Sequence, residues 1–186
     1  MCKRLGIEAV ITADPDTIRT ASKLLLPGVG HFKKGMENLH KGGLKTVLDD
    51  LVLNKKKPIL GICLGAQLMT KHSEEGDVDG LGWIDADTVR FDQSNDHTMK
   101  VPHMGWSEIN TTGSNPLWSN LPVEPRFYFV HTYHFLFTDK SEISATCHYS
   151  YDFVCAFQKN NIYGTQFHPE KSHKFGMKVL ENFNQL

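Results

Sequence analysis

The chain has 186 residues, of which 40% are hydrophobic and 22% charged, enough apolar material for one domain spanning residues 1–186. Its 20 basic and 21 acidic residues nearly cancel, so the sequence offers no electrostatic surface for nucleic acid or for an anionic membrane. No apolar stretch approaches the length needed to cross a bilayer, which argues against a membrane-spanning helix.

The first half of the chain alternates between strand and helix patterns. The pair Asp14 and Pro15 is typical of a capped helix start, and the apolar run Ile59–Ile62 is typical of a buried strand. Such alternation favours parallel βα units, with ligands bound beyond the carboxyl ends of the strands. The predicted elements are strands over Glu8–Thr12, Lys23–Leu26 and Ile59–Ile62, and helices starting at Asp14, within Leu39–Leu53 and over Leu64–His72.

From Trp83 onward the strand patterns follow one another more closely. The predicted strands are Asp87–Phe91, Phe127–Val130, Ile143–Thr146, Phe153–Gln158 and Ile162–Phe167, and a closing helix covers Lys174–Phe183. The sequence contains no internal repeat, low-complexity tract or obvious linker. We therefore expect an α/β fold with a mostly parallel central sheet, flanking helices and an additional strand-rich part.

Cys63 stands between two glycines, after a buried strand and before a helix-forming run that starts at Leu64. Strand, sharp turn and helix are the plan of a nucleophile elbow, here with sulfur in place of a hydroxyl. The start of a helix favours a thiolate and can hold an oxyanion, although a lone cysteine is more often an inert core residue. The other cysteines, Cys2, Cys147 and Cys155, show no metal-site spacing, and no signal peptide is apparent. We therefore expect a reduced, cytoplasmic protein.

A candidate base for this cysteine lies near the C-terminus, in the run His168, Pro169 and Glu170. A cysteine nucleophile needs a base, and the base needs an acceptor that orients it, often from a distant part of the sequence. The proline stiffens the backbone between the two side chains, and the preceding strand pattern places the imidazole at an edge of the sheet. Cys63, His168 and Glu170 are the predicted catalytic residues.

Five motifs lie in order along almost the whole chain: Leu26–Gly30, Gly61–Gly65, Val101–Trp106, Phe127–His131 and Gln166–Ser172. Together they resemble the class I, triad-type glutamine amidotransferases, and more closely the glutaminase subunits of imidazole glycerol phosphate synthase. The cysteine elbow and His-Pro-Glu are typical of the whole superfamily, whereas Pro-His-Met-Gly-Trp points to this subunit. The resemblance implies the flavodoxin-like fold of the class I amidotransferases.

The resemblance also implies a reaction. Cys63 would attack the side-chain amide of glutamine, His168 would move the proton, and Glu170 would orient the imidazole. The glutamyl thioester would then be hydrolysed to glutamate, with no metal or organic cofactor. Considered alone, Pro27–Gly30 would be only a turn that ends a strand. The expected oxyanion and substrate-binding residues are Val29, Gly30, Leu64, Gln67, Thr132 and Tyr133.

Ammonia is mostly protonated in neutral water, so a glutaminase used for synthesis must pass its product on directly. The resemblance implies a heterodimer with a (β/α) barrel cyclase subunit, which makes imidazole glycerol phosphate and aminoimidazole carboxamide ribotide in histidine biosynthesis. It places Met104 and Trp106 at the partner interface, although core or loop packing is equally common for such residues. His131 and His134 lack further metal ligands, so no metal site is expected.

The chain departs from the family pattern in three ways. It begins inside the first family helix, so we expect the first family strand to be missing. Thr132 and Ser107 stand where the family usually has serine and asparagine. With Lys171–Lys174, these changes also resemble paralogous subunits that deliver ammonia to surface-glycan sugars. The remaining alternatives are a stand-alone cysteine hydrolase and an inactive assembly subunit.

Overall fold

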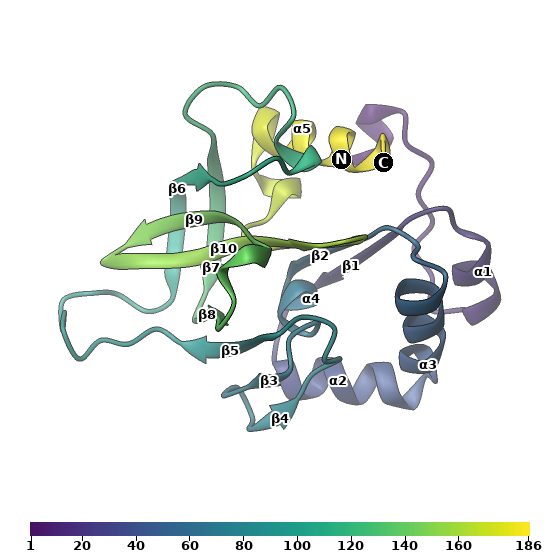
Figure 1. Cartoon of the computed structure of the whole chain (residues 1–186), viewed down its shortest axis with the longest axis horizontal. Helices are drawn as coiled ribbons and strands as arrows, with labels where there is room; N and C mark the ends of the chain where they lie inside the picture. The colour runs from purple at the N-terminus through teal and green to yellow at the C-terminus, as the bar shows by residue number, and fades with distance from the viewer.

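The computed structural model describes residues 1–186, in which helices flank a mixed and curled sheet (Figure 1). The helices are α1 (Pro15–Thr20), α2 (Phe32–Lys41), α3 (Leu44–Asp49), α4 (Leu64–Gln67) and α5 (His173–Asn184). The strands are β1 (Leu24–Gly28), β2 (Ile59–Cys63), β3 (His72–Ser73), β4 (Val78–Asp79), β5 (Ala86–Arg90), β6 (His103–Thr111), β7 (Arg126–His131), β8 (Tyr133–Phe137), β9 (Ile143–Tyr149), β10 (Tyr151–Lys159) and β11 (Ile162–Thr165). One π turn (Asp50–Asn54) and four 3₁₀ turns (Cys2–Leu5, Pro116–Trp118, Lys140–Glu142, Pro169–Lys171) complete the chain.

The strand order confirms the α/β class but corrects the expectation of a mostly parallel sheet. The main path runs β1-β2-β11-β10-β8-β5-β3-β4, and β6 connects β7 to β9. Only β1 with β2, β2 with β11 and β3 with β5 pair in parallel; all other pairs are antiparallel. Parallel neighbours need a long crossover, whereas β9, β10 and β11 follow one another after short turns, which give antiparallel pairs.

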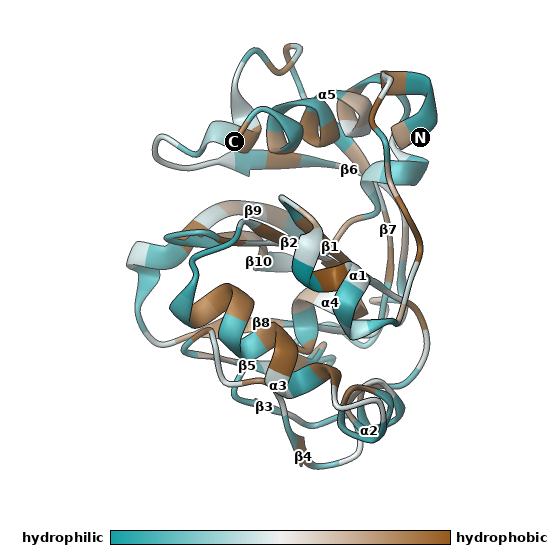
Figure 2. Ribbon diagram, turned by 90° about the vertical axis from the view of Figure 1, so that its right-hand side faces the viewer, coloured by the Kyte–Doolittle hydropathy of each residue, from teal (hydrophilic) through white to brown (hydrophobic).

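Two apolar cores lie on opposite faces of β2. Ile59 belongs to the core that contains Phe32 and the helices α2, α3 and α4, whereas Leu60 and Ile62 belong to the core that contains Val179 of α5. Figure 2 shows this layering, with α5 and both termini on one side of the strands and α2 and α3 on the other. Burial on both faces explains the unbroken apolar run of β2. The strand is thus held firmly where it ends, at Cys63.

The strand predicted over Glu8–Thr12 is wrong. The segment forms no secondary structure, and Ile11 is fully exposed. A strand needs a neighbour to take up its hydrogen bonds, and the neighbouring strand β1 pairs only with β2. A helix does begin after Asp14, whose side chain accepts a hydrogen bond from the Thr17 backbone as an N-cap.

The helix predicted over Leu64–His72 is also shorter than expected. It ends at Gln67, because the carbonyl groups of Leu68, Met69 and Thr70 accept hydrogen bonds from a returning segment, residues 81–84. The sequence did not indicate α2, which is capped by the His31 side chain rather than by a usual capping residue. It also did not indicate β3, β4, β6 or β8, because their apolar patterns are short or interrupted by polar residues.

Candidate active site

A pocket of about 330 Å³ lies beyond the carboxyl ends of β1 and β2, where parallel strands of α/β proteins bind ligands. It is lined by eight of the residues predicted from the sequence: Val29, Gly30, Cys63, Leu64, Gln67, Thr132, Tyr133 and His168. Glu170 does not line the pocket but hydrogen-bonds to His168. Positions far apart in the sequence thus come together at one place.

Cys63 occupies a strained turn between β2 and α4. Its φ of +52° and ψ of −116° are unfavourable for a residue with a side chain, and such strain is typical of functional sites. Three glycines leave room for the tight turn: a Cβ on Gly61 would lie 2.6 Å from the Cα of Ala66, one on Gly28 would lie 2.8 Å from the Gly65 nitrogen, and Gly65 is crowded still more closely by backbone atoms. The geometry is that of a nucleophile elbow.

The backbone of His168 is fixed at the end of β11. Its N–H donates to the Tyr128 carbonyl oxygen at 3.0 Å, and its own carbonyl accepts from the Ser172 hydroxyl at 2.6 Å. Ser172 Oγ in turn accepts from the Tyr128 N–H at 3.0 Å. The histidine is therefore held by strand β7 and by the start of α5 at once.

The imidazole of His168 is almost fully buried and joined to a carboxylate. Its Nδ1 lies 2.7 Å from Glu170 Oε1, and its Nε2 has no hydrogen-bond partner in this geometry. Burial alone would lower the pKa of His168, but the nearby Cys63 sulfur and then Glu170 raise this pKa to about 9. Burial is the largest single influence on Glu170 and would raise its pKa, but the His168 hydrogen bond, a backbone hydrogen bond and the charges of His168 and Lys171 together lower the pKa, so this residue stays a carboxylate. At neutral pH the imidazole of His168 is therefore protonated on both nitrogens and positively charged.

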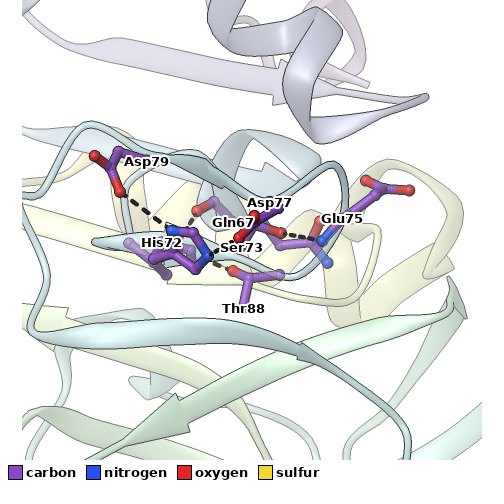
Figure 3. Close-up of polar contacts among 8 residues, drawn as sticks. Gln67, His72, Ser73, Glu75, Asp77, Asp79 and Thr88 are labelled. Atoms are coloured by element: carbon purple, nitrogen blue, oxygen red, sulfur yellow. Dashed lines mark hydrogen bonds and ion pairs between the residues drawn. The ribbon is translucent and has the colours of Figure 1, made fainter.

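Glu75 also lines the pocket, and the sequence did not indicate it. It lies in the turn of the β3–β4 hairpin, which Figure 3 shows with His72 between Asp77 and Asp79. The Glu75 N–H donates to Ser73 Oγ at 3.0 Å, and its Oε2 accepts from the Phe32 N–H at 2.7 Å. No local motif marks this position, because it reaches the pocket only through its contact with α2.

Met104 and Trp106 lie on the outward face of β6, with 62% and 45% of their surface exposed. Met104 is opposite Val130, which lines the pocket, so this face adjoins the candidate active site. The Trp106 ring stacks on His173 with 5.4 Å between centroids and an interplanar angle of 7°. The structure thus places both predicted interface residues in solvent rather than in the core.

No three His, Cys, Asp or Glu side chains gather where they could hold a metal ion. His134 Nε2 lies 3.0 Å from the Tyr151 hydroxyl, and His131 hydrogen-bonds to His103 instead. All four cysteines are free thiols. The chain also has no helix of the length and apolarity that a membrane span requires.

Together with the α/β sheet, the strained cysteine places the protein in the class of α/β enzymes with a thiol nucleophile elbow. Comparison with known families narrows the class. The model of the class-I glutamine amidotransferases matches residues 6–185. The chain belongs to this family and, within it, to the HisH subunits of imidazole glycerol phosphate synthase, as the following relatives indicate.

Imidazole glycerol phosphate synthase subunit HisH 2 of Methanococcus maripaludis is 51% identical over 183 residues, 98% of this chain and 90% of that protein. The protein of the same name from Pseudomonas aeruginosa is 46% identical over 186 residues, 100% of this chain and 91% of that protein. Among solved structures, a glutamine amidotransferase from Thermotoga maritima has a TM-score of 0.60. The two sequences are 19% identical, and the match covers 98% of this chain and 69% of the Thermotoga chain, so the two proteins are similar in fold.

Proposed function

We propose that the chain hydrolyses glutamine to glutamate and ammonia and passes the ammonia to a (β/α) barrel cyclase subunit. That subunit would use it to make imidazole glycerol phosphate and aminoimidazole carboxamide ribotide in histidine biosynthesis. One observation carries the proposal: Cys63 on its strained turn and His168 with its Glu170 partner face the same pocket. Membership of the amidotransferase family and the names of the relatives support the substrate and the pathway.

In the first step, His168 takes the thiol proton of Cys63, and the sulfur attacks the side-chain amide carbon of glutamine. The carbon–nitrogen bond breaks with transfer of a proton from His168 to the departing ammonia. The raised pKa of His168, about 9, keeps that proton in place at neutral pH. Glu170 orients the imidazole through Nδ1 and stabilises its positive charge. His168, now neutral, then takes a proton from the water that hydrolyses the thioester.

Backbone N–H groups stabilise the negative oxygen that forms during each step. Leu64 is the first residue of α4, so its N–H has no acceptor within the helix, and it lines the pocket next to Cys63. Val29 and Gly30 form another part of the pocket wall and offer the second donor. In comparable sites each such donor contributes ~3 kcal/mol to transition-state stabilisation.

The amino-acid end of glutamine fits the polar part of the pocket. The Glu75 carboxylate complements the α-ammonium group, and Thr132 and Tyr133 offer polar groups beside it. Both hydrogens of Gln67 Nε2 are already donated within the chain, so its Oε1 is the atom left for the substrate. Gln67 therefore binds as an acceptor.

The cyclase subunit docks on the exposed face of β6 around Met104 and Trp106. This face adjoins the pocket wall at Val130, which keeps the path for ammonia short. A large apolar or aromatic side chain left in solvent beside a binding pocket is typical of an interface. The thiol chemistry needs a reduced Cys63 and hence a reducing compartment such as the cytoplasm.

Glutamate release tests the proposal directly, measured with and without the cyclase and its nucleotide ligand. Cys63→Ala should abolish release and the glutamyl adduct seen by mass spectrometry, whereas Cys2→Ala, outside the pocket, should match the wild type. The cyclase should raise the wild-type rate strongly. Release that persists in Cys63→Ala would contradict the assignment of the nucleophile. A high rate independent of the cyclase would favour a stand-alone hydrolase, and binding without turnover would favour an assembly subunit.

A further inference from the structure

The backbone carbonyl oxygen of Tyr133 accepts two hydrogen bonds beside the pocket. One comes from His131 Nδ1 at 2.8 Å, and the other comes from Gln67 Nε2 at 3.1 Å. A carbonyl oxygen can only accept, so both partners must donate. This single fact fixes the tautomer of the histidine and the orientation of the glutamine amide.

The first arm of the network leads away from the pocket to strand β6. Because Nδ1 of neutral His131 carries the hydrogen, its Nε2 accepts from His103 Nδ1 at 3.1 Å. His103 Nε2 is then an acceptor as well, and Ser107 Oγ donates to it at 2.9 Å. Both rings are buried, which lowers the pKa of His103 to about 4 and the pKa of His131 well below its ordinary value. Every bond of this arm has one allowed direction.

The second arm leads from the same carbonyl to the nucleophile. Gln67 Nε2 donates its other hydrogen to Gln166 Oε1 at 3.0 Å, so the amide nitrogen of Gln166 must point the other way. That nitrogen lies 3.7 Å from Cys63 Sγ, within the longer reach of hydrogen bonds to sulfur. Gln166 is fully buried, so these two bonds are not exposed to competition from solvent.

We propose that this directed chain, from Ser107 through the Tyr133 carbonyl to Gln166, holds an N–H donor against the Cys63 sulfur. The donor stabilises the negative sulfur both when it attacks and when it leaves the thioester. Gln166 is a further catalytic residue because it touches the reacting sulfur, whereas His103 and His131 are positioning residues. The network also joins the nucleophile to β6, whose opposite face carries Met104 and Trp106. The inference rests on the proposal that Cys63 is the nucleophile.

Other ionisable groups around the network are few. Cys63 shares the pocket with His168, Glu75, Lys171 and Tyr133.

His131 has His103, His134 and His168 as ionisable neighbours, and Tyr149 stacks on His103 with 4.0 Å between centroids. No carboxylate forms a hydrogen bond with His103 or His131; the Tyr133 carbonyl raises the pKa of His131, but burial outweighs this effect.

The tautomers can be read directly by ¹⁵N NMR of the imidazole rings in the wild-type chain. We expect His103 and His131 to be neutral with the hydrogen on Nδ1, at every pH from 6 to 8. The Nε2–H tautomer or an imidazolium at either residue would overturn the first arm. The measurement needs neither glutamine nor a partner, so it is independent of whether the proposed function holds.

The donor to sulfur can be tested through the pH dependence of Cys63 alkylation by iodoacetamide, followed by peptide mass spectrometry. Gln166→Glu places an acceptor against the sulfur. It should slow alkylation at pH 7 at least fivefold and move the midpoint of the pH profile to higher pH. Gln158→Glu makes the same change on β10, outside the pocket, and serves as the matched control. Cys2 is the internal reference for reagent activity.

A second variant covers the case in which Gln166→Glu does not fold. Gln166→Met keeps the size of the side chain and removes the donor without adding charge, so it should shift the midpoint in the same direction by a smaller amount. A folded Gln166 variant whose alkylation profile matches that of Gln158→Glu would overturn the second arm. Normal alkylation of the wild type without glutamine turnover would instead contradict only the proposed function.

Discussion

Gly65 lies directly against the carbonyl oxygen of Leu26: a Cβ on Gly65 would stand 1.7 Å from that oxygen. The contact brings the first turn of α4 against β1 and thereby fixes the direction in which the elbow leaves β2. A glycine is required here for space rather than for backbone conformation, because its φ is not positive.

Gly65→Ala should therefore destabilise the chain by at least ~3 kcal/mol, because the clash is with backbone atoms that cannot move aside. Gly42→Ala is the matched control, since its Cβ would meet the flexible Leu44 side chain at 3.3 Å and its φ is −80°. That change should alter the free energy of unfolding by less than ~1 kcal/mol. Urea unfolding of both variants compares the two. Equal stability would contradict the role of the Leu26 contact.

Ser172→Ala should reduce both stability and turnover. The Ser172 hydroxyl donates to the carbonyl of His168 and accepts from the Tyr128 N–H, and both groups lose a partner in a buried place. We expect a loss of ~2 kcal/mol in the free energy of unfolding and a lower kcat. Ser144→Ala provides the comparison, because that buried hydroxyl has no hydrogen-bond partner and its loss should cost little. The idea fails if the two variants unfold and turn over alike.

The sequence predicts those parts of the site that are fixed by local motifs. The glycines around Cys63 demand a tight turn, and the proline after His168 sets the spacing to Glu170, so these side chains could be assigned before the fold was known. Glu75 and Gln166 could not, because their roles depend on contacts with residues 43 and 103 positions away, Phe32 and Cys63.

The elements of the fold likewise separate into those that local sequence predicts and those that depend on distant contacts. The strand β2 can be predicted from its own sequence, because a run of four apolar or small residues is typical of a strand that is covered on both faces. Glu8–Thr12 also has an apolar centre, but it has no strand beside it, and the presence of neighbouring strands decides whether such a segment forms a strand. The returning segment, residues 81–84, ends α4 through backbone hydrogen bonds to residues 68–70, and the apolar pattern of the helix itself does not reveal these bonds.

The raised pKa of His168 should appear as a pH dependence of stability. A histidine whose pKa in the folded state, about 9, exceeds the ordinary 6.5 stabilises the fold fully below pH 6.5, and this contribution is lost as the pH rises through 9. Cys63→Ala removes the largest of the causes that raise this pKa, so it should lower the His168 midpoint seen by NMR and move the decline in stability to lower pH. An unchanged midpoint in Cys63→Ala would show that the sulfur does not act on the imidazole.

Glu170→Gln should lower kcat by ~10²–10⁴ with little change in KM. The amide keeps the shape of the side chain, but it no longer stabilises the imidazolium or fixes the tautomer. Glu181→Gln is the matched control, because Glu181 is similarly exposed and is paired with Lys178 on α5. Steady-state glutamine hydrolysis in the presence of the cyclase subunit measures both. A kcat of Glu170→Gln within threefold of that of Glu181→Gln would remove Glu170 from the mechanism.

The outward face of β6 gives the last prediction, which concerns binding of the cyclase subunit. Trp106→Ala and Met104→Ala should each weaken the complex at least ~tenfold in Kd, because buried aromatic and methionine side chains dominate the energy of interfaces. Leu53→Ala is the control, since Leu53 is also exposed but precedes β2, at the end of the strand opposite the pocket. Titration calorimetry with the cyclase subunit gives the three affinities. If Leu53→Ala weakens binding while Trp106→Ala does not, the partner docks at the amino ends of the strands, and ammonia would have to cross the sheet to reach it.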